Sequence, residues 1–331
     1  MSVVHSASCE PLAPAVIELS VVVPVYGNQD TLPALISQLR DLTGMVGIQI
    51  EAVFVVDGSP DGSLLVLRRL LPDCGFPAQL ISHSRNFGSF AAVRTGFAAA
   101  RGRFVAVIAA DLQEPPELLV DFYRTLSQGE VDVVVGRREH RQDPFLTRIS
   151  SAAYWALYRR FILRELPPGG VDVFGCTRPV AERLLTLNES HTSLVGLLYW
   201  LGFRRAEVTY IRQPRRSGRS GWSWRRRIRY LLDSIYSFTD VPVTLLVTAG
   251  LVGGILTLTA SVVVFVARVT GVIHQAGYTP IMLVVLLSTF TLLFGLGVVG
   301  SYVWRTYENS KGRPSAVPMS HEVFEPSADA T

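Results

Sequence analysis

Several signals that mark common enzyme classes are missing from this sequence. Its 331 residues include only three cysteines, without the spacing of a metal site, which is typical of proteins kept in a reducing compartment. No Gly-x-Gly-x-x-Gly follows the first apolar run, and neither a Walker lysine loop nor a Gly-x-Ser-x-Gly segment is present. These absences disfavour a dinucleotide-binding enzyme, a P-loop nucleoside triphosphatase and a serine hydrolase.

Charge is missing from two long stretches near the C-terminus of a chain whose mean hydropathy is +0.32. Asp240 and Arg268 bracket 27 uncharged residues, and Arg268 and Arg305 bracket a second uncharged stretch. Each exceeds the roughly 20 residues that cross the hydrocarbon core of a bilayer. We therefore predict two transmembrane helices, at about 242–267 and 279–304, in preference to a pair of buried core helices.

The placement of basic residues predicts the orientation of these spans. The connection at 269–278 has no Lys or Arg, whereas both outer flanks are basic. The flanking residues are Arg225, Arg226, Arg227 and Arg229 before the first span, and Arg305, Lys311 and Arg313 after the second. By the positive-inside rule, both termini and the large N-terminal domain are expected in the cytoplasm. Residues 1–14 have no continuous apolar core, so no signal sequence is expected.

The first third of the chain alternates strand and helix patterns. Apolar runs of strand length occur at 17–25, 50–56, 78–82 and 103–110, with segments of helical spacing between them. This alternation predicts a parallel, doubly wound sheet whose loops converge at one edge.

Polar residues follow three of these strands. Tyr26 follows the first, Asp57 and Asp61 the second, and Asp111 and Gln113 the fourth. A single Asp after a strand is usually turn chemistry, but three such strand ends point to a site. Asp111 and Gln113 would face the same way if the backbone stayed extended. Carboxylate and amide oxygens suit Mg²⁺ or Mn²⁺, which would bridge to a phosphate; the alternative is a polar turn.

Four motifs together resemble those of family 2 glycosyltransferases of the GT-A fold. They are VPVY at 23–26, DGSPDGS at 57–63, RNFG at 85–88 and DLQEPPE at 111–117. More narrowly, they are similar to polyprenyl-phosphate glycosyltransferases of the dolichol-phosphate mannose synthase-like and bactoprenol glucosyltransferase-like branch. The likeness covers about residues 18–313.

The resemblance implies an organisation in five parts. A tail at 1–16 precedes a Rossmann-like, mostly parallel α/β GT-A domain at 17–222. An amphipathic helix at 223–240 would lie on the membrane, and 241–305 would form the two-helix transmembrane hairpin. Residues 306–331 are expected to be a cytoplasmic tail that is flexible after Lys311.

Site roles also follow from the resemblance. The expected nucleotide-sugar-binding residues are Pro24, Tyr26, Asp57, Asp61, Asp111, Gln113, Arg215 and Arg219. Those expected to bind the acceptor phosphate are Arg137, Arg148 and Ser151, and the catalytic pair is Asp111 and Asp172. The metal, Mg²⁺ or Mn²⁺, would be held by Asp111 and Gln113.

Three positions depart from the family pattern. Val56 replaces the first of two adjacent acids, Ala109 the first Asp of the Asp-x-Asp motif, and Gly221 a lysine. A bound cation would therefore have fewer protein ligands than in the family, which puts metal dependence in question.

The expected activity is inverting transfer of a hexose from a UDP- or GDP-hexose to polyprenyl phosphate, undecaprenyl phosphate in a bacterium, at the cytoplasmic membrane face. A tetramer is expected by resemblance. The three departures favour one alternative, a non-catalytic nucleotide- or lipid-binding relative that acts as a membrane scaffold. A processive synthase is disfavoured because no Gln-x-x-Arg-Trp motif occurs. The basic stretch at 212–229 borders a predicted span, where anionic headgroups attract such segments, so a nucleic-acid patch is disfavoured. The resemblance implies that its loop at 215–222 orders over the donor diphosphate.

Overall fold

The computed structural model describes most of the chain. The described residues are 17–139, 171, 173–187, 189, 193–213, 232–236, 239, 241–271 and 278–326. The predicted tail at 1–16 and most of the predicted amphipathic helix at 223–240 lie outside them; of that helix the structure describes 232–236, which are helical, and 239.

An eight-stranded sheet forms the centre of the domain, in the order β7-β5-β6-β4-β1-β2-β3-β8. Its strands are β1 (Leu19–Val25), β2 (Ile50–Val56), β3 (Ala78–His83), β4 (Phe104–Val107), β5 (Val133–Arg138), β6 (Phe174–Thr177), β7 (Arg205–Tyr210) and β8 (Pro318–Phe324). Strands β6 and β8 run antiparallel to their neighbours, and the other strand pairs are parallel. The mostly parallel sheet predicted from the sequence is confirmed.

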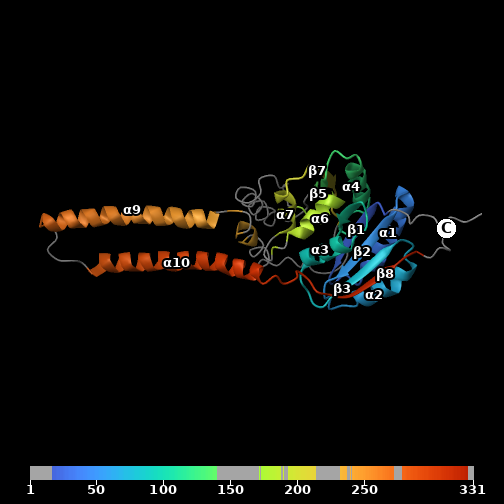
Figure 1. Cartoon of the computed structure of the whole chain (residues 1–331), viewed down its shortest axis with the longest axis horizontal. Coiled ribbons are helices and arrows are strands. Elements are labelled where there is room, and N and C mark those ends of the chain that lie inside the picture. Colours follow the sequence, from blue (N-terminus) through green and yellow to red (C-terminus); the bar gives the residue numbers. More distant parts are fainter. Residues whose placement is uncertain are drawn as a thin grey trace, which may run out of the picture.

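Helices cover both faces of this sheet (Figure 1). In β1, Val21 and Val23 pack with α1, α2 and α4, whereas Val22 packs with α3, α6 and α7. Because successive side chains point to opposite faces, burial of both faces requires strands that are apolar almost throughout. The helices are α1 (Leu32–Val46), α2 (Ser63–Leu70), η1 (Leu71–Asp73), α3 (Ser89–Ala99), α4 (Glu117–Ser127), α6 (Arg178–Thr186) and α7 (Leu194–Trp200).

One predicted strand ends earlier than expected. The first strand ends at Val25, as predicted, and Pro24 lies opposite Val55 within it. The strand expected at 103–110 is shorter, because β4 ends at Val107 and the chain then turns before Asp111.

The last strand, β8, occupies part of the segment predicted to be a flexible tail. It pairs antiparallel with β3 and forms one edge of the sheet. Its polar side chains all find partners: Ser320 bonds to Ser82, and Glu322 accepts two hydrogen bonds from Arg68. The tail prediction was wrong here because Ser320, His321 and Glu322 interrupt the apolar residues of β8, and the partners of these three residues are distant in sequence.

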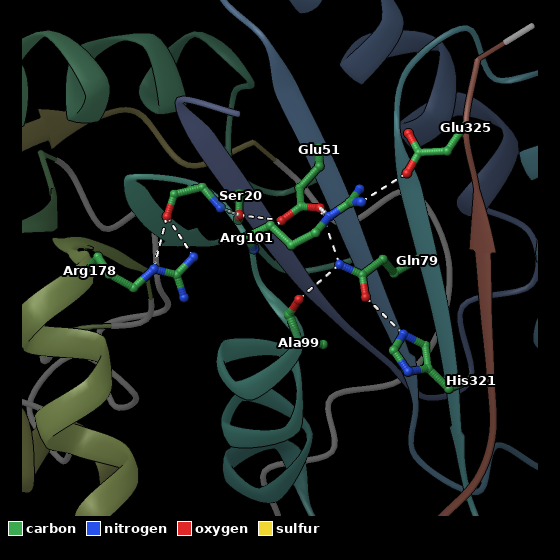
Figure 2. Close-up of polar contacts among 9 residues, drawn as sticks. Ser20, Glu51, Gln79, Ala99, Arg101, Arg178, His321 and Glu325 are labelled. Atoms are coloured by element: carbon green, nitrogen blue, oxygen red, sulfur yellow. Dashed lines mark hydrogen bonds and ion pairs between the residues drawn. The ribbon is translucent and has the colours of Figure 1, made fainter. Parts of the chain in front are cut away.

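A buried carboxylate, Glu51, connects the strands at the edge where β2 begins (Figure 2). It accepts hydrogen bonds from Ser20 Oγ at 2.5 Å, from Gln79 Nε2 at 3.1 Å and from Arg101 Nε at 2.8 Å. Burial opposes ionisation, but these donors outweigh it and lower the pKa of Glu51. Gln79 Oε1 also accepts a hydrogen bond from His321 Nε2 at 2.8 Å, so β8 joins the same network.

Two long helices, α9 (Val241–Val269) and α10 (Tyr278–Ser310), occupy the ranges in which membrane spans were predicted. They extend side by side away from the sheet (Figure 1). Among the residues that the structure describes, however, no helix is both long enough and apolar enough to cross a membrane, so the predicted spans are not confirmed.

The Glu51 network gives a stability prediction. Glu51→Ala would leave Ser20 and Gln79 with buried donors that lack their acceptor, and we expect a loss of about 3 kcal/mol in the free energy of unfolding. Glu322→Ala removes a carboxylate whose ion pair with Arg68 is largely exposed, so its effect should be much smaller. Denaturant unfolding of both full-length variants measures the difference; equal losses would contradict the assigned role of Glu51.

Candidate functional site

The polar residues predicted at the strand ends meet at one edge of the sheet. Strands β4, β1, β2 and β3 are consecutive neighbours that run in the same direction, so their C-terminal ends lie together. Hydrogen bonds then connect the turns that follow them. Thr31 Oγ1 donates to the carbonyl of Ala110 at 2.6 Å, which joins the turn after β1 to the turn after β4. Gly27 N–H donates to Ser59 Oγ at 2.8 Å, which joins it to the turn after β2.

Asp57 is almost fully buried and already has three protein donors. Its Oδ1 lies 2.8 Å from His83 Nδ1 and accepts from Phe87 N–H at 2.8 Å, and its Oδ2 accepts from Gly88 N–H at 2.7 Å. A carboxylate has about four lone-pair sites, so capacity for a further donor remains. The main role visible for Asp57 is to fix the RNFG loop against the end of β2.

Gly58 allows that close approach. It has a left-handed φ of 57°, and a Cβ at this position would lie 2.3 Å from the carbonyl carbon of Arg85. Any other residue would therefore push the two turns apart.

Asp61 and Tyr26 have contrasting surroundings. Asp61 accepts from Ser59 Oγ at 2.6 Å and from Gln29 N–H at 3.0 Å. Partial burial raises its pKa, but the bonds from Ser59 and its neighbours prevail and lower the pKa of Asp61 below its usual value. Tyr26 is 52% exposed, so its ring is open to a flat ligand. Pro24 lies in β1 just before it.

The turn after β4 is not the extended segment that was expected. Leu112 has a φ of 58°, the one positive φ of a non-glycine residue among those described. Such a conformation costs about 1–3 kcal/mol and is concentrated at functional sites. It folds the chain so that Gln113 N–H faces Asp111 Oδ1 at 3.3 Å. Asp111 and Gln113 are therefore neighbours through a turn and not through strand periodicity.

Gln113 is joined to the segment that follows β7. Its Oε1 accepts from Arg212 Nη2 at 2.5 Å, its carbonyl accepts from Gln213 N–H at 2.8 Å, and its Nε2 donates to the Gln213 carbonyl at 3.3 Å. Reasoning from the sequence did not find Arg212, because nothing local connects residues about 100 positions apart.

Glu114 is a second site residue that the sequence analysis missed. Its side chain is 1% exposed, neither carboxyl oxygen has a hydrogen-bond partner among the described residues, and Oε1 lies 4.0 Å from Arg212 Nε. Burial, followed by the charge of Asp111, raises the pKa of Glu114 to about 7. Its position between Gln113 and two prolines made it resemble an ordinary turn residue.

The residues of this turn do not fit a divalent cation well. Ala109 supplies no ligand atom, and the amide oxygen of Gln113 faces a guanidinium. No group of three or more His, Cys, Asp or Glu residues in the described part of the chain could hold a metal. Charges of +2 and +1 about 4 Å apart repel by roughly 8 kcal/mol at an effective dielectric constant of about 20, so a cation on Gln113 would have to displace Arg212.

The remaining predicted site residues are placed as follows. Arg137 lies near the end of β5, separated from β4 by β6, and pairs with Glu207 at 3.1 Å. The others lie outside the described residues: Arg148, Ser151, Asp172, Arg215 and Arg219. Their roles stay predictions.

Comparison with known proteins gives consistent matches. A family model described as Glycosyl transferase family 2 matches residues 20–185. An uncharacterized glycosyltransferase of Synechocystis sp. is 30% identical over 90% of this chain and 93% of its own length. Undecaprenyl-phosphate 4-deoxy-4-formamido-L-arabinose transferase of Klebsiella pneumoniae is 28% identical over 91% of this chain and 92% of its own length. Among solved structures, glucosyl-3-phosphoglycerate synthase of Mycobacterium tuberculosis aligns with 61% of this chain and 73% of that chain, at 21% identity and a TM-score of 0.45.

The raised pKa of Glu114 predicts a pH-dependent stability. The folded protein holds this proton up to about pH 7, whereas the unfolded chain releases it near pH 4.5. Stability is therefore fully present below pH 4.5 and is lost as the pH rises through 7, by about 3 kcal/mol in total. Glu114→Gln removes this titration, so the variant should gain stability relative to the parent between pH 5 and pH 8.

Denaturant unfolding of full-length protein at both pH values tests this expectation. Glu117→Gln, which neutralises an exposed acid at the start of α4, controls for the loss of one negative charge. A constant difference between parent and Glu114→Gln across the pH range would contradict the prediction.

Proposed function

Because this chain belongs to glycosyl transferase family 2, we propose that it transfers a hexose from a nucleotide diphosphate sugar to polyprenyl phosphate, with inversion at C1. The observation that carries the proposal is the set of polar strand ends that meet at one sheet edge, from Tyr26 through Asp57 to Asp111. A relative that bears an undecaprenyl-phosphate sugar transferase name and aligns with 91% of the chain supports the lipid acceptor.

The path of the chain also supports an acceptor held in a membrane. The chain leaves the sheet after Tyr210, at the end of β7, and returns at Pro318, which lies opposite His83 at the end of β3. β7 and β8 are the two outermost strands of the sheet, and the C-terminal end of β7 and the N-terminal end of β8 lie at the edge that carries the site. We propose, on the uncharged stretches of the sequence, that α9 and α10 insert in the cytoplasmic membrane. The site would then face the surface at which a lipid phosphate lies.

The donor would bind along the turns after β1, β2 and β4. The exposed ring of Tyr26 suits stacking on a nucleotide base. Asp57 has capacity to accept a hydrogen bond from the base or ribose, and Asp111 would accept from the sugar or ribose hydroxyls. Holding the sugar in this way aligns C1 with the incoming nucleophile, and such alignment lowers the barrier of a displacement reaction.

The acceptor phosphate needs little activation. The second pKa of a phosphate monoester is about 6, so at neutral pH most of the acceptor is already a dianion. Its oxygen can attack C1 directly while the nucleotide diphosphate leaves from the opposite side. Arg137 would hold this phosphate, together with Arg148 and Ser151, and Asp172 would position the acceptor or the sugar.

A direct assay tests the proposed activity. Full-length protein in detergent is incubated with undecaprenyl phosphate, a panel of radiolabelled UDP- and GDP-hexoses, and both Mg²⁺ and Mn²⁺. We expect label in the organic phase with one donor, as a β-linked lipid-phosphate sugar. If demonstrably folded protein gives no product with any donor, the proposal is contradicted and a non-catalytic scaffold is favoured.

The assigned role of Asp111 predicts a selective loss of activity. Asp111→Ala should lower the transfer rate by roughly 100-fold or more, because the sugar is no longer aligned, and should leave folding intact because the Asp111 side chain is only partly buried. Asp121→Ala removes an exposed acid on the outer face of α4 and serves as the matched control. Parental turnover in Asp111→Ala would overturn the site assignment.

A further inference from the structure

We propose that the guanidinium of Arg212 is the cation that stabilises the departing diphosphate, so that sugar transfer by this protein requires no divalent metal ion. The inference rests on the glycosyltransferase function proposed above. It concerns the charge that meets the donor phosphates, a role that the family resemblance gives to a metal held by Asp111 and Gln113.

Arg212 is fixed beside the Asp111 turn by a residue that was expected to bind metal. Its Nη2 donates to Gln113 Oε1 at 2.5 Å. Gln213 and Gln113 share two further hydrogen bonds. The Gln213 N–H donates to the Gln113 carbonyl, and the side-chain amide of Gln113 donates to the Gln213 carbonyl. Three hydrogen bonds thus hold one residue of the turn after β4 to two residues after β7. A cation held in this way needs little reorganisation when negative charge develops next to it, which is the condition for effective electrostatic stabilisation.

The guanidinium also keeps donors available for a phosphate. Arginine has five N–H donors, and Gln113 takes one of them. The side chain is 29% exposed, so a donor molecule can reach it from the open side. On the closed side, Nε is buried 4.0 Å from Glu114 and has no hydrogen-bond partner among the described residues. The terminal nitrogens form a planar fork that matches two phosphate oxygens.

A divalent ion has poor ligands at the same place. Mg²⁺ needs ligand oxygens at about 2.0–2.1 Å in a nearly octahedral arrangement. Ala109 offers no oxygen where the family motif has a carboxylate, and the amide oxygen of Gln113 already faces a positive group. With one carboxylate fewer at the turn, the site carries less negative charge, which favours one permanent positive charge over a doubly charged ion.

The chemical step balances without any other reactant. An oxygen of the acceptor phosphate forms a bond to C1 of the sugar as the bond between C1 and the diphosphate oxygen breaks. The electron pair of that bond leaves with the diphosphate. Arg212 donates hydrogen bonds to the oxygens on which the charge accumulates and keeps its proton throughout, since a guanidinium is not deprotonated in proteins.

The test measures transfer to undecaprenyl phosphate by full-length protein in detergent, with the donor identified by the assay above. We expect the parent to keep its rate in excess EDTA after dialysis against chelator. Arg212→Ala should lower kcat by about 100-fold or more. Arg212→Lys, which keeps the charge but loses the fork, should fall between the two. Arg183→Ala, an exposed arginine of α6, is the matched control and should behave as the parent.

A second variant distinguishes loss of the Arg212 charge from loss of folding. Ala109→Asp restores the missing carboxylate, and in combination with Arg212→Ala it should regain transfer when Mn²⁺ is added and bind Mn²⁺ detectably by electron paramagnetic resonance. Loss of parental transfer in EDTA with recovery in Mg²⁺ or Mn²⁺ would overturn the inference, as would a parental kcat in Arg212→Ala. A parent that transfers no sugar even with both metals present contradicts the proposed function instead.

Discussion

Strand β2 has a buried carboxylate at each end, and the need to supply both with hydrogen-bond donors determines much of the architecture. An unpaired buried charge costs several kcal/mol, so each acid draws in groups from neighbouring elements. Glu51 takes donors from β1, from β3 and from the backbone before β4. Asp57 takes them from the end of β3 and from the main chain of Phe87 and Gly88. Asp57 therefore holds the loop after β3 against the end of β2.

The two edges of the sheet have divided roles. Around Glu51, every polar group is paired inside the protein, and β8 closes the network from the C-terminal end of the chain (Figure 2). At the opposite edge the groups are only partly satisfied: Tyr26 is exposed, Glu114 has unpartnered oxygens among the described residues, and Leu112 is strained. Incomplete pairing and strain at one edge are what a ligand can relieve.

The sequence predicted the parts of this arrangement that depend on local pattern. Apolar runs and turn residues identified β1, β2 and β3, and the direction of parallel strands brought Asp57 and Asp111 to one edge. Contacts between distant segments could not be predicted in this way. The hydrogen bond between Arg212 and Gln113 depends on the register of β7. The burial of Glu114 depends on which residues pack over the turn. The strand β8 was missed because partners such as Ser82 lie more than 200 positions away.

The structure shows what surrounds two of the positions that depart from the family pattern, Val56 and Ala109. These surroundings help to decide whether the chain is a non-catalytic relative. Val56 replaces an acid, but its side chain is 3% exposed and belongs to the hydrophobic core, so the substitution exchanges a charge for packing and leaves Asp57 in place. Ala109 replaces a second acid where Arg212 brings a fixed positive charge to the same turn. A positive charge therefore lies beside this turn even though one carboxylate of the family motif is missing, and the turn keeps a group that can face a negatively charged ligand.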